Sequence, residues 1–356
     1  MYNPKIILVT GGSGFIGSHY IEHVLTVDSK VRVINLDALT YAANPLFSDL
    51  MKNKYPGRHD FIRANICDQA ALTAVFTDHN IDTVVHFAAE THVDNSLHQQ
   101  ELFLQTNVIG TNTLLQTSLM FWQKRFMLDP QLCRFHHIST DEVYGTLELN
   151  AASSFNENSP YRPNSPYSAS KASSDHVVRC YSKSYQLPTT MTNTSNNFGP
   201  RQHREKFIPT IIRSCLLKQN IPVYGDGKNI RDWLYVKDHC SMIHAVIKQG
   251  EVGEHYNIGG NHEISNIHLC ETITRLMNQN SHDSFDHRQL ITHVQDRPGH
   301  DLRYAIDMSK YVSNIGPFTY THFEKALQSV INDELKQLNI SNFTNRNFID
   351  ENTTTR

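Results

Sequence analysis

The sequence predicts an α/β fold: a Rossmann-like, doubly wound parallel sheet with a smaller, mixed α/β C-terminal domain. Short apolar, β-branched runs alternate with helical patterns along the first half of the chain, which is typical of βαβ units. The strand-like runs are apolar almost throughout, as expected for a sheet covered on both faces. A glycine-rich turn separates the first such run from the first helical pattern.

The alternation assigns the elements and the domains. Strands are expected at 5–10, 31–36, 60–64, 82–87, 133–138 and 188–193, and helices at 15–26, 69–79, 101–125 and 165–185. Residues 1–198, rejoined by part of 232–260, are expected to form the first domain, and residues 199–338 mainly the second. The polar segment 339–356, rich in Asn and Thr, is expected to be a tail.

Composition excludes several functional classes. The 356 residues carry a net charge of -3 without a basic patch, which argues against a nucleic-acid partner. No apolar run approaches the roughly 18 residues of a membrane span, and the N-terminal segment lacks the features of a signal peptide. Six dispersed cysteines without a CxxC pair suit a reducing, cytoplasmic environment. His19 and His23 share a helical face without a third ligand, so no metal site is expected.

The glycine-rich turn predicts a dinucleotide site. Gly11, Gly14 and Gly17 form a GxxGxxG pattern after the first strand, where glycines allow the backbone to approach a pyrophosphate at the helix N-terminus. Asp37 ends the second strand, 20 positions after Gly17. A carboxylate there would bind the ribose hydroxyls and repel a 2′-phosphate, which favours NAD over NADP. Without Asp37, a plain strand-to-helix turn would explain the glycines as well.

Two further patterns supply acid–base groups. Tyr167 and Lys171 lie four apart on one helical face, about 6 Å apart along the axis, so the ammonium is expected to favour the phenolate. Asp141 and Glu142 follow Thr140 just beyond the strand expected at 133–138, at the sheet edge where ligands of doubly wound folds bind. Neighbouring carboxyls tend to divide into an acid and a base. Alone, the Asp–Glu pair would more simply be a solvated loop.

These patterns occur within longer segments that resemble a known family. The segments are 35–42, 86–94, 139–145, 166–175, 193–197, 223–227, 229–233 and 296–301. The chain resembles the extended short-chain dehydrogenase/reductases, and among them the nucleotide-hexose 4,6-dehydratases, from about residue 5 to about residue 327. The resemblance implies a nucleotide-sugar substrate held mainly by the C-terminal domain.

The resemblance also implies a mechanism. Tyr167, assisted by Lys171, takes the proton of the sugar 4-hydroxyl while C4 gives a hydride to NAD. Glu142 then removes the C5 proton while Asp141 protonates the departing 6-hydroxyl, with Thr140 bonded to the C4 oxygen, and the hydride returns to C6. The expected substrate is dTDP-glucose and the product a 4-keto-6-deoxy sugar, a precursor in deoxysugar biosynthesis such as that of rhamnose for lipopolysaccharide. UDP- or CDP-glucose dehydration, nucleotide-sugar 4-epimerisation or decarboxylation, and a catalytically silent NAD-binding scaffold stay open.

Further positions carry over from the family one at a time. The expected cofactor-binding residues are Gly11, Gly14, Phe15, Ile16, Gly17, Asp37, Leu39, Thr40, Asn65, Ile66, Phe87, Ala88, Ala89, Thr106, Tyr167, Lys171 and Asn197. The expected substrate-binding residues are Thr91, Thr140, Asn196, Lys206, Phe207, Pro222, Tyr224, Arg231, Asn266, Arg297 and His300. Asn65 stands where the family usually has aspartate, which predicts weaker cofactor binding. The resemblance further implies a homodimer formed through helices 101–125 and 165–185.

Overall fold

The protein is described here as a computed structural model, in which residues 1–281, 284–296 and 298–338 are described. The chain divides into two compact units. The first comprises Met1–Asn197, Ile230–Glu263 and Gly299–Tyr320, and the second comprises Phe198–Asn229, Ile264–Pro298 and the chain from Thr321 onward. The tail expected at 339–356 lies outside the described residues.

The first unit is built on a seven-stranded sheet in the order β10-β6-β5-β4-β1-β2-β3. Its strands are β1 Ile6–Thr10, β2 Arg32–Asp37, β3 His59–Arg63, β4 Thr83–His86, β5 Arg134–Thr140, β6 Thr189–Thr194 and β10 His255–Ile258. Every neighbouring pair is parallel. The predicted doubly wound fold is therefore confirmed, and the strand order reverses between β1 and β4, where such sheets bind ligands.

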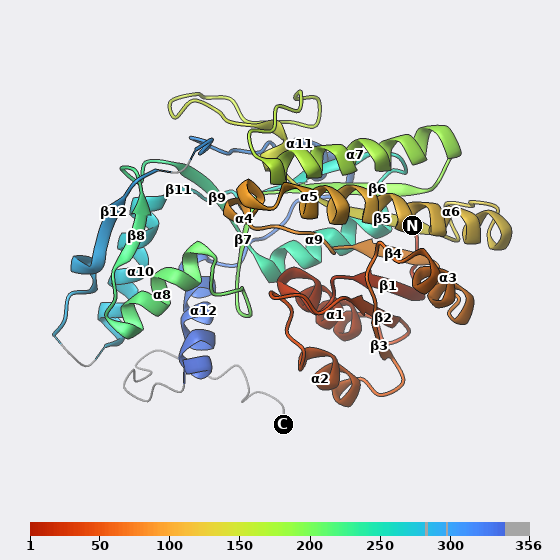
Figure 1. Ribbon diagram of the computed structural model, residues 1–356, viewed down its shortest axis with the longest axis horizontal. Coiled ribbons are helices and arrows are strands. Elements are labelled where there is room, and N and C mark those ends of the chain that lie inside the picture. Colours follow the sequence, from red (N-terminus) through yellow and green to blue (C-terminus); the bar gives the residue numbers. More distant parts are fainter. Residues whose placement is uncertain (282–283, 297, 339–356) are drawn as a thin grey trace. The chain divides into compact units, whose positions relative to one another are not determined.

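Helices cover both faces of this sheet. They are α1 Phe15–Val27, α2 Phe47–Lys54, α3 Gln69–Asp78, α4 Val93–His98, α5 Gln100–Phe103, η1 Leu104–Gly110, α6 Thr111–Arg125, η2 Asp141–Tyr144, α7 Pro166–Tyr185, α9 Val236–Gln249 and α11 Ser309–Asn314. α1 packs against α9 on one face, and α3 and α7 pack against α6 on the other (Figure 1). Leu114 and Trp122 of α6 are fully buried there among apolar strand residues such as Leu8, as a two-sided sheet requires.

Two differences from the sequence prediction have local causes. The helix expected at 101–125 changes to a π-helical turn, η1, between α5 and α6, a feature frequent at functional sites. Segment 299–320, expected with the second domain, belongs to the first unit. It is held there by backbone bonds, in which Ile230 N donates to Leu302 O (2.8 Å) and Phe155 N donates to Ala305 O (2.8 Å).

The second unit contains α8 Phe207–Leu217, β8 Ile221–Tyr224, α10 Asn266–Asn280, η3 His287–Leu290, β12 Ile291–Val294 and α12 Phe323–Leu338. β8 and β12 form a parallel pair. The remaining strands, β7 Asn196–Phe198, β9 Ile230–Tyr235 and β11 Glu263–Ser265, form a three-stranded sheet in the order β11-β9-β7, of which β9 belongs to the first unit. Within the second unit Arg213 of α8 bonds to Glu334 of α12 at 3.1 Å, and Glu334 is almost fully buried. Its mixed composition agrees with the smaller α/β unit expected from sequence.

Candidate active site

The turn between β1 and α1 has no room for side chains at its glycines. Gly11 adopts φ +68, and a Cβ there would lie 2.7 Å from the backbone nitrogen of Ala88. A Cβ at Gly17 would lie 2.3 Å from the carbonyl oxygen of Gly11. Gly14, the N-cap of α1, makes no side-chain capping bond, so amides of the first turn, including those of Phe15 and Ile16, can donate to a phosphate. This cradle fits the pyrophosphate of NAD.

Asp37 at the end of β2 is held by two backbone amides. Its Oδ2 accepts from Ser13 N at 2.9 Å, and its Oδ1 accepts from Leu39 N at 2.8 Å. Burial raises the pKa of Asp37, and these two amides oppose that rise. Leu39 itself adopts φ +54, which turns the chain toward Thr40. Each carboxyl oxygen retains a lone pair for a ribose hydroxyl, as NAD requires.

The other predicted cofactor residues differ in their freedom to bind. Asn65 Oδ1 accepts from Cys67 N at 2.8 Å, which leaves its amide nitrogen as the group to meet an adenine ring. Thr106 lies half-buried on η1. Asn197 is held on both sides, since its Nδ2 donates to Thr194 Oγ1 (3.1 Å) and its Oδ1 lies 2.8 Å from His239 Nδ1. His239 was not identified from the sequence.

The remaining predicted residues of this group, Ile66, Phe87, Ala88 and Ala89, follow strands β3 and β4 at the same sheet edge. Phe87 N donates to Thr10 O at 3.0 Å, which draws the start of this segment against β1. Ala88 thereby lies against Gly11, as the short distance above shows. Phe87 and Ala88 therefore lie at the β1–α1 turn, whereas Ile66 lies beside η1, where a Cβ on Gly110 would be 2.6 Å from its Cδ1.

Thr140, Asp141 and Glu142 form the carboxyl end of β5 and the start of η2. Thr140 caps η2, its Oγ1 accepting from Glu142 N at 3.2 Å. The Thr140 hydroxyl donates to Asp141 Oδ1 at 3.3 Å, and it also acts on Tyr167, where it opposes the rise in the pKa of the phenol. Thr140 therefore connects the two acid–base systems predicted from sequence, and the loop alternative for the carboxyl pair is set aside.

The surroundings of Asp141 favour its protonated form. Its side chain is 1% exposed, and burial raises its pKa well above the usual range, with further contributions from the charges of Glu142 and Asp232. Arg231 and the bond from Thr140 oppose that rise only in part. Asp141 Oδ2 has no hydrogen-bond partner among the described residues. A buried carboxylic acid with a free oxygen suits proton donation to a bound hydroxyl.

The prediction for Tyr167 needs correction. We expected Lys171 to lower the pKa of the phenol, but burial and the charge of Glu142 raise it instead. Lys171 Nζ donates to Ile138 O at 2.8 Å, and burial lowers the pKa of Lys171 to about 8. The motif correctly placed both groups on α7, where both are buried. Burial, and not their mutual interaction, is the largest cause of the pKa shift of each group.

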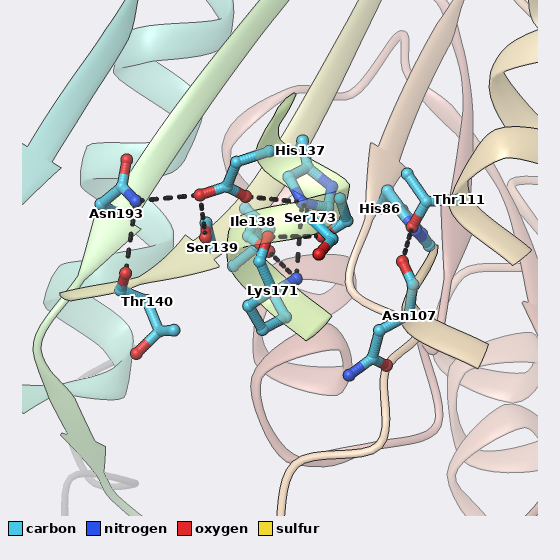
Figure 2. A network of polar contacts seen from close by, with 12 residues as sticks. His86, Asn107, Thr111, His137, Ile138, Ser139, Thr140, Lys171, Ser173 and Asn193 are labelled. Carbon is cyan, nitrogen blue, oxygen red and sulfur yellow. Dashed lines mark hydrogen bonds and ion pairs between the residues drawn. The ribbon is translucent and has the colours of Figure 1, made fainter. Parts of the chain in front are cut away.

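A buried polar network surrounds these groups, and sequence reasoning missed it (Figure 2). Asp175, one turn beyond Lys171 on α7, lies 3.2 Å from His137 Nε2. Asn107 Nδ2 donates to Ser170 Oγ at 2.8 Å and ties η1 to α7. The available signals were the adjacent His136 and His137 in the strand expected at 133–138 and the i, i+4 spacing of Lys171 and Asp175.

The predicted substrate residues are divided between the units. The first unit contains Thr91, Thr140, Asn196, Arg231 and His300, and the second contains Lys206, Phe207, Pro222, Tyr224 and Asn266. Arg297 lies outside the described residues.

The surroundings of two predicted substrate-binding residues, Arg231 and Tyr224, show what each side chain is able to contact. In the first unit Arg231 Nη2 donates to Asp301 O at 2.9 Å, and its guanidinium lies 4.3 Å from the ring centroid of Tyr304. Arg231 is therefore fixed by its own unit and is not a freely extended phosphate ligand. In the second unit Tyr224 is 40% exposed at the end of β8, so its ring is accessible to a planar base.

Neither a metal centre nor a membrane anchor is found in the part of the chain that the structure describes. None of its His, Cys, Asp and Glu side chains gather in threes as potential metal ligands. Its helices are all too short or too polar to cross a bilayer.

The doubly wound sheet, the NAD-type glycine turn and the Tyr167–Lys171 pair define the class: a nicotinamide-dependent enzyme of the extended short-chain dehydrogenase/reductase type. A family model described as GDP-mannose 4,6 dehydratase matches residues 8–330, and the chain belongs to this family of 4,6-dehydratases.

Named relatives are close over nearly the whole chain. It is 44% identical over 332 residues to a dTDP-glucose 4,6-dehydratase of Neisseria gonorrhoeae, covering 92% of this chain and 94% of the relative. The solved dTDP-glucose 4,6-dehydratase of Streptomyces venezuelae, with NAD bound, is similar with a TM-score of 0.83 and 37% identity, covering 93% of this chain and 97% of the other. That of Bacillus anthracis, in complex with NAD, has a TM-score of 0.81 and 39% identity, covering 93% and 96%.

The glycine turn generates a prediction about NAD binding. Gly11→Ala would place a methyl group against the backbone of Ala88 at a positive φ, so we expect NAD affinity to fall at least tenfold, measured by calorimetric titration. Gly57→Ala is the matched control, because Gly57 adopts a similar φ of +73 with no heavy atom within 4 Å of the added Cβ. Equal NAD affinities in the two variants would contradict the claim that the glycine turn binds the pyrophosphate.

Proposed function

We propose that this chain catalyses the NAD-dependent dehydration of dTDP-glucose to dTDP-4-keto-6-deoxyglucose, a hydro-lyase reaction. The observation that carries the proposal is the position of Thr140, which bonds to Asp141 (3.3 Å) and to the amide of Glu142 (3.2 Å) and, with both carboxyls, acts on the buried Tyr167. It brings a dehydrogenase-type tyrosine together with an acid–base carboxyl pair. An oxidation alone needs no such pair. The curated relatives named above have the same activity.

The oxidation step uses α7 and the end of β5. Tyr167, as the phenolate, takes the proton of the sugar 4-hydroxyl, and Thr140 bonds to the oxygen that becomes the 4-ketone. Lys171 supplies the positive charge that favours the phenolate. NAD, when bound by the glycine turn and Asp37, accepts the hydride of C4 and returns it to C6.

The elimination step uses the carboxyl pair. A 4-ketone acidifies the neighbouring C5 proton, which Glu142 takes up as a carboxylate. Asp141 gives its proton to the C6 hydroxyl, the C–O bond breaks and water leaves, forming a C5–C6 double bond. Return of the hydride to C6 and of the proton to C5 gives the 4-keto-6-deoxy sugar. The raised pKa of Asp141 and the half-buried position of Glu142 support this division of roles.

We assign substrate binding partly to the second unit and infer a homodimer. Tyr224 offers an exposed ring for the nucleotide base, and Lys206, at the N-cap of α8, is a cation suited to the diphosphate. Large exposed apolar side chains of α5, η1 and α6, including Leu102, Leu104 and Ile109, support a dimer that uses these helices. A cytoplasmic location and a place in deoxysugar biosynthesis, such as that of rhamnose, complete the proposal.

A substrate panel tests the activity. Purified protein with NAD and dTDP-glucose should form a 4-keto product lighter than the substrate by one water, detected by mass spectrometry and by absorbance in alkali. Faster turnover with UDP- or CDP-glucose would reassign the nucleotide. A product that retains the C6 oxygen would favour the epimerase alternative, and the absence of any product would favour the silent scaffold.

Single substitutions separate the two steps. Glu142→Gln should allow oxidation but slow elimination at least a hundredfold, so reduced NAD accumulates and absorbs near ~340 nm in a stopped-flow trace. Tyr167→Phe should abolish that reduction, since no base receives the hydroxyl proton. Glu148→Gln, an exposed change on the same loop, serves as the control and should behave as the unmodified enzyme. Indistinguishable traces for Glu142→Gln and Tyr167→Phe would refute the assigned roles.

A further inference from the structure

Asp175 is a buried carboxyl that the proposed mechanism does not use. Its side chain lies on α7 and is 2% exposed. Its Oδ2 accepts from Ser139 Oγ at 2.7 Å, from Tyr161 OH at 3.0 Å and from Asn193 Nδ2 at 3.3 Å. Its Oδ1 lies 3.2 Å from His137 Nε2. Burial raises the pKa of Asp175, and the charge of Lys171 and the three hydrogen bonds to Oδ2 oppose that rise and favour the ionised carboxylate.

His137 Nε2 lies 3.2 Å from Asp175 Oδ1 and 3.4 Å from Lys171 Nζ, and Figure 2 shows His137 beside Lys171. We assign the imidazole proton to Nε2, because Nδ1 has no hydrogen-bond partner among the described residues and a buried N–H without an acceptor is costly. The 3.2 Å contact of Nε2 with Asp175 Oδ1 is electrostatic and lacks hydrogen-bond geometry. The ammonium of Lys171 lies 3.4 Å from the same nitrogen while it donates to Ile138 O at 2.8 Å. The lysine is thus held within the field of one buried carboxylate.

The other groups near Lys171 do not supply negative charge. His137 on β5 and His86 on β4 interact electrostatically with Lys171, and burial lowers the pKa of each well below its usual value, so both are neutral. Tyr167 on the same helix has a raised pKa and is a phenol in the resting site. Burial lowers the pKa of Lys171 to about 8, and the charge of Asp175 opposes that fall.

We propose that Asp175 is a positioning residue of the dehydratase: through His137 it acts as the buried counter-ion that keeps Lys171 cationic and directed toward the catalytic end of β5. The same carboxylate steadies Thr140, because Asn193 Nδ2 bonds to both Asp175 and Thr140 O (3.2 Å). This inference rests on the proposed oxidation step, in which the lysine charge stabilises the phenolate.

The role has a specific pH dependence. When Tyr167 and Lys171 together lose one proton, the productive form is phenolate with ammonium, and the unproductive form is phenol with neutral amine. At pH values below the pKa of the pair, the amount of the productive form depends only on the pKa of Tyr167. At pH values above the pKa of the pair, the amount of the productive form depends on the difference between the pKa values of Tyr167 and Lys171, because that difference decides which group has lost the proton.

Asp175 is the charge that opposes the fall in the pKa of Lys171, whereas it is the last of the causes that raise the pKa of Tyr167. Removing it therefore lowers the pKa of the lysine more than that of the tyrosine and favours proton loss from the lysine, so the defect should appear only at higher pH.

The test is Asp175→Asn, measured as the single-turnover rate of NAD reduction by dTDP-glucose between about pH 6 and pH 9. A loss of about one unit in the pKa of Lys171 would lower the plateau rate about tenfold and move the acid limb to lower pH. At pH 6 the rate should stay within about twofold of the unmodified enzyme. A deficit of equal size at every pH would show a merely structural role and overturn the proposal.

Two controls and a second readout separate charge from packing. Tyr161→Phe removes one hydrogen bond from Asp175 without changing its charge, and Asp175→Glu keeps the charge in a longer side chain. Both should retain the pH profile of the unmodified enzyme, even if their rates are lower overall. In ¹³C-lysine NMR of the NAD-free enzyme, the Lys171 resonance should titrate with a pKa of about 8. In Asp175→Asn this pKa should be about one unit lower. An unchanged titration would overturn the counter-ion role, whereas failure of the substrate panel would instead affect the proposed function.

Discussion

Burial of ionisable side chains at the carboxyl end of β5 is the constraint on which the rest of the site depends. Burying a charge is costly unless other groups satisfy it. Here the protein meets that cost in two ways. Burial raises the pKa of both Asp141 and Asp175, and each leaves one oxygen without a hydrogen-bond partner among the described residues. Around Asp141 the charges of Glu142 and Asp232 add to the rise, whereas around Asp175 the charge of Lys171 and hydrogen bonds from Ser139 and Tyr161 oppose it. Two buried carboxyls close to β5 are thereby suited to different uses, proton donation and charge stabilisation.

The parallel sheet makes this arrangement possible. Its strands end together at one edge, so β1, β2, β4 and β5 bring the glycine turn, Asp37, Ala88 and Thr140 to one side of the first unit. α7 then places Tyr167 and Lys171 near the end of β5, where Lys171 Nζ donates to Ile138 O. The capping box at Ser165, in which Ser165 and Ser168 bond reciprocally, fixes where α7 begins and so sets the position of the tyrosine on its first turn.

The sequence predicted what depends on local pattern. The strands, the glycine turn, Asp37, the tyrosine–lysine spacing and the carboxyl pair follow from short motifs, and the structure places them in one unit. It did not predict the raised pKa of Tyr167, because a motif does not show how deeply its residues are buried. It also missed the pairing of His137 with Asp175, because that contact joins β5 to α7 through tertiary packing. Segment 299–320 was misplaced because its attachment to Ile230 is made by backbone bonds, to which side-chain patterns give no guide.

The central claim is that one buried site oxidises C4 and dehydrates C5 and C6 of the same sugar without releasing the hydride. dTDP-glucose carrying deuterium at C4, incubated with the enzyme and NAD in ordinary water, tests it directly by mass spectrometry and NMR of the product. The account predicts a 4-keto-6-deoxy sugar with the deuterium at C6 and a solvent-derived proton at C5. Loss of the deuterium to solvent, or its retention at C4, would contradict the account.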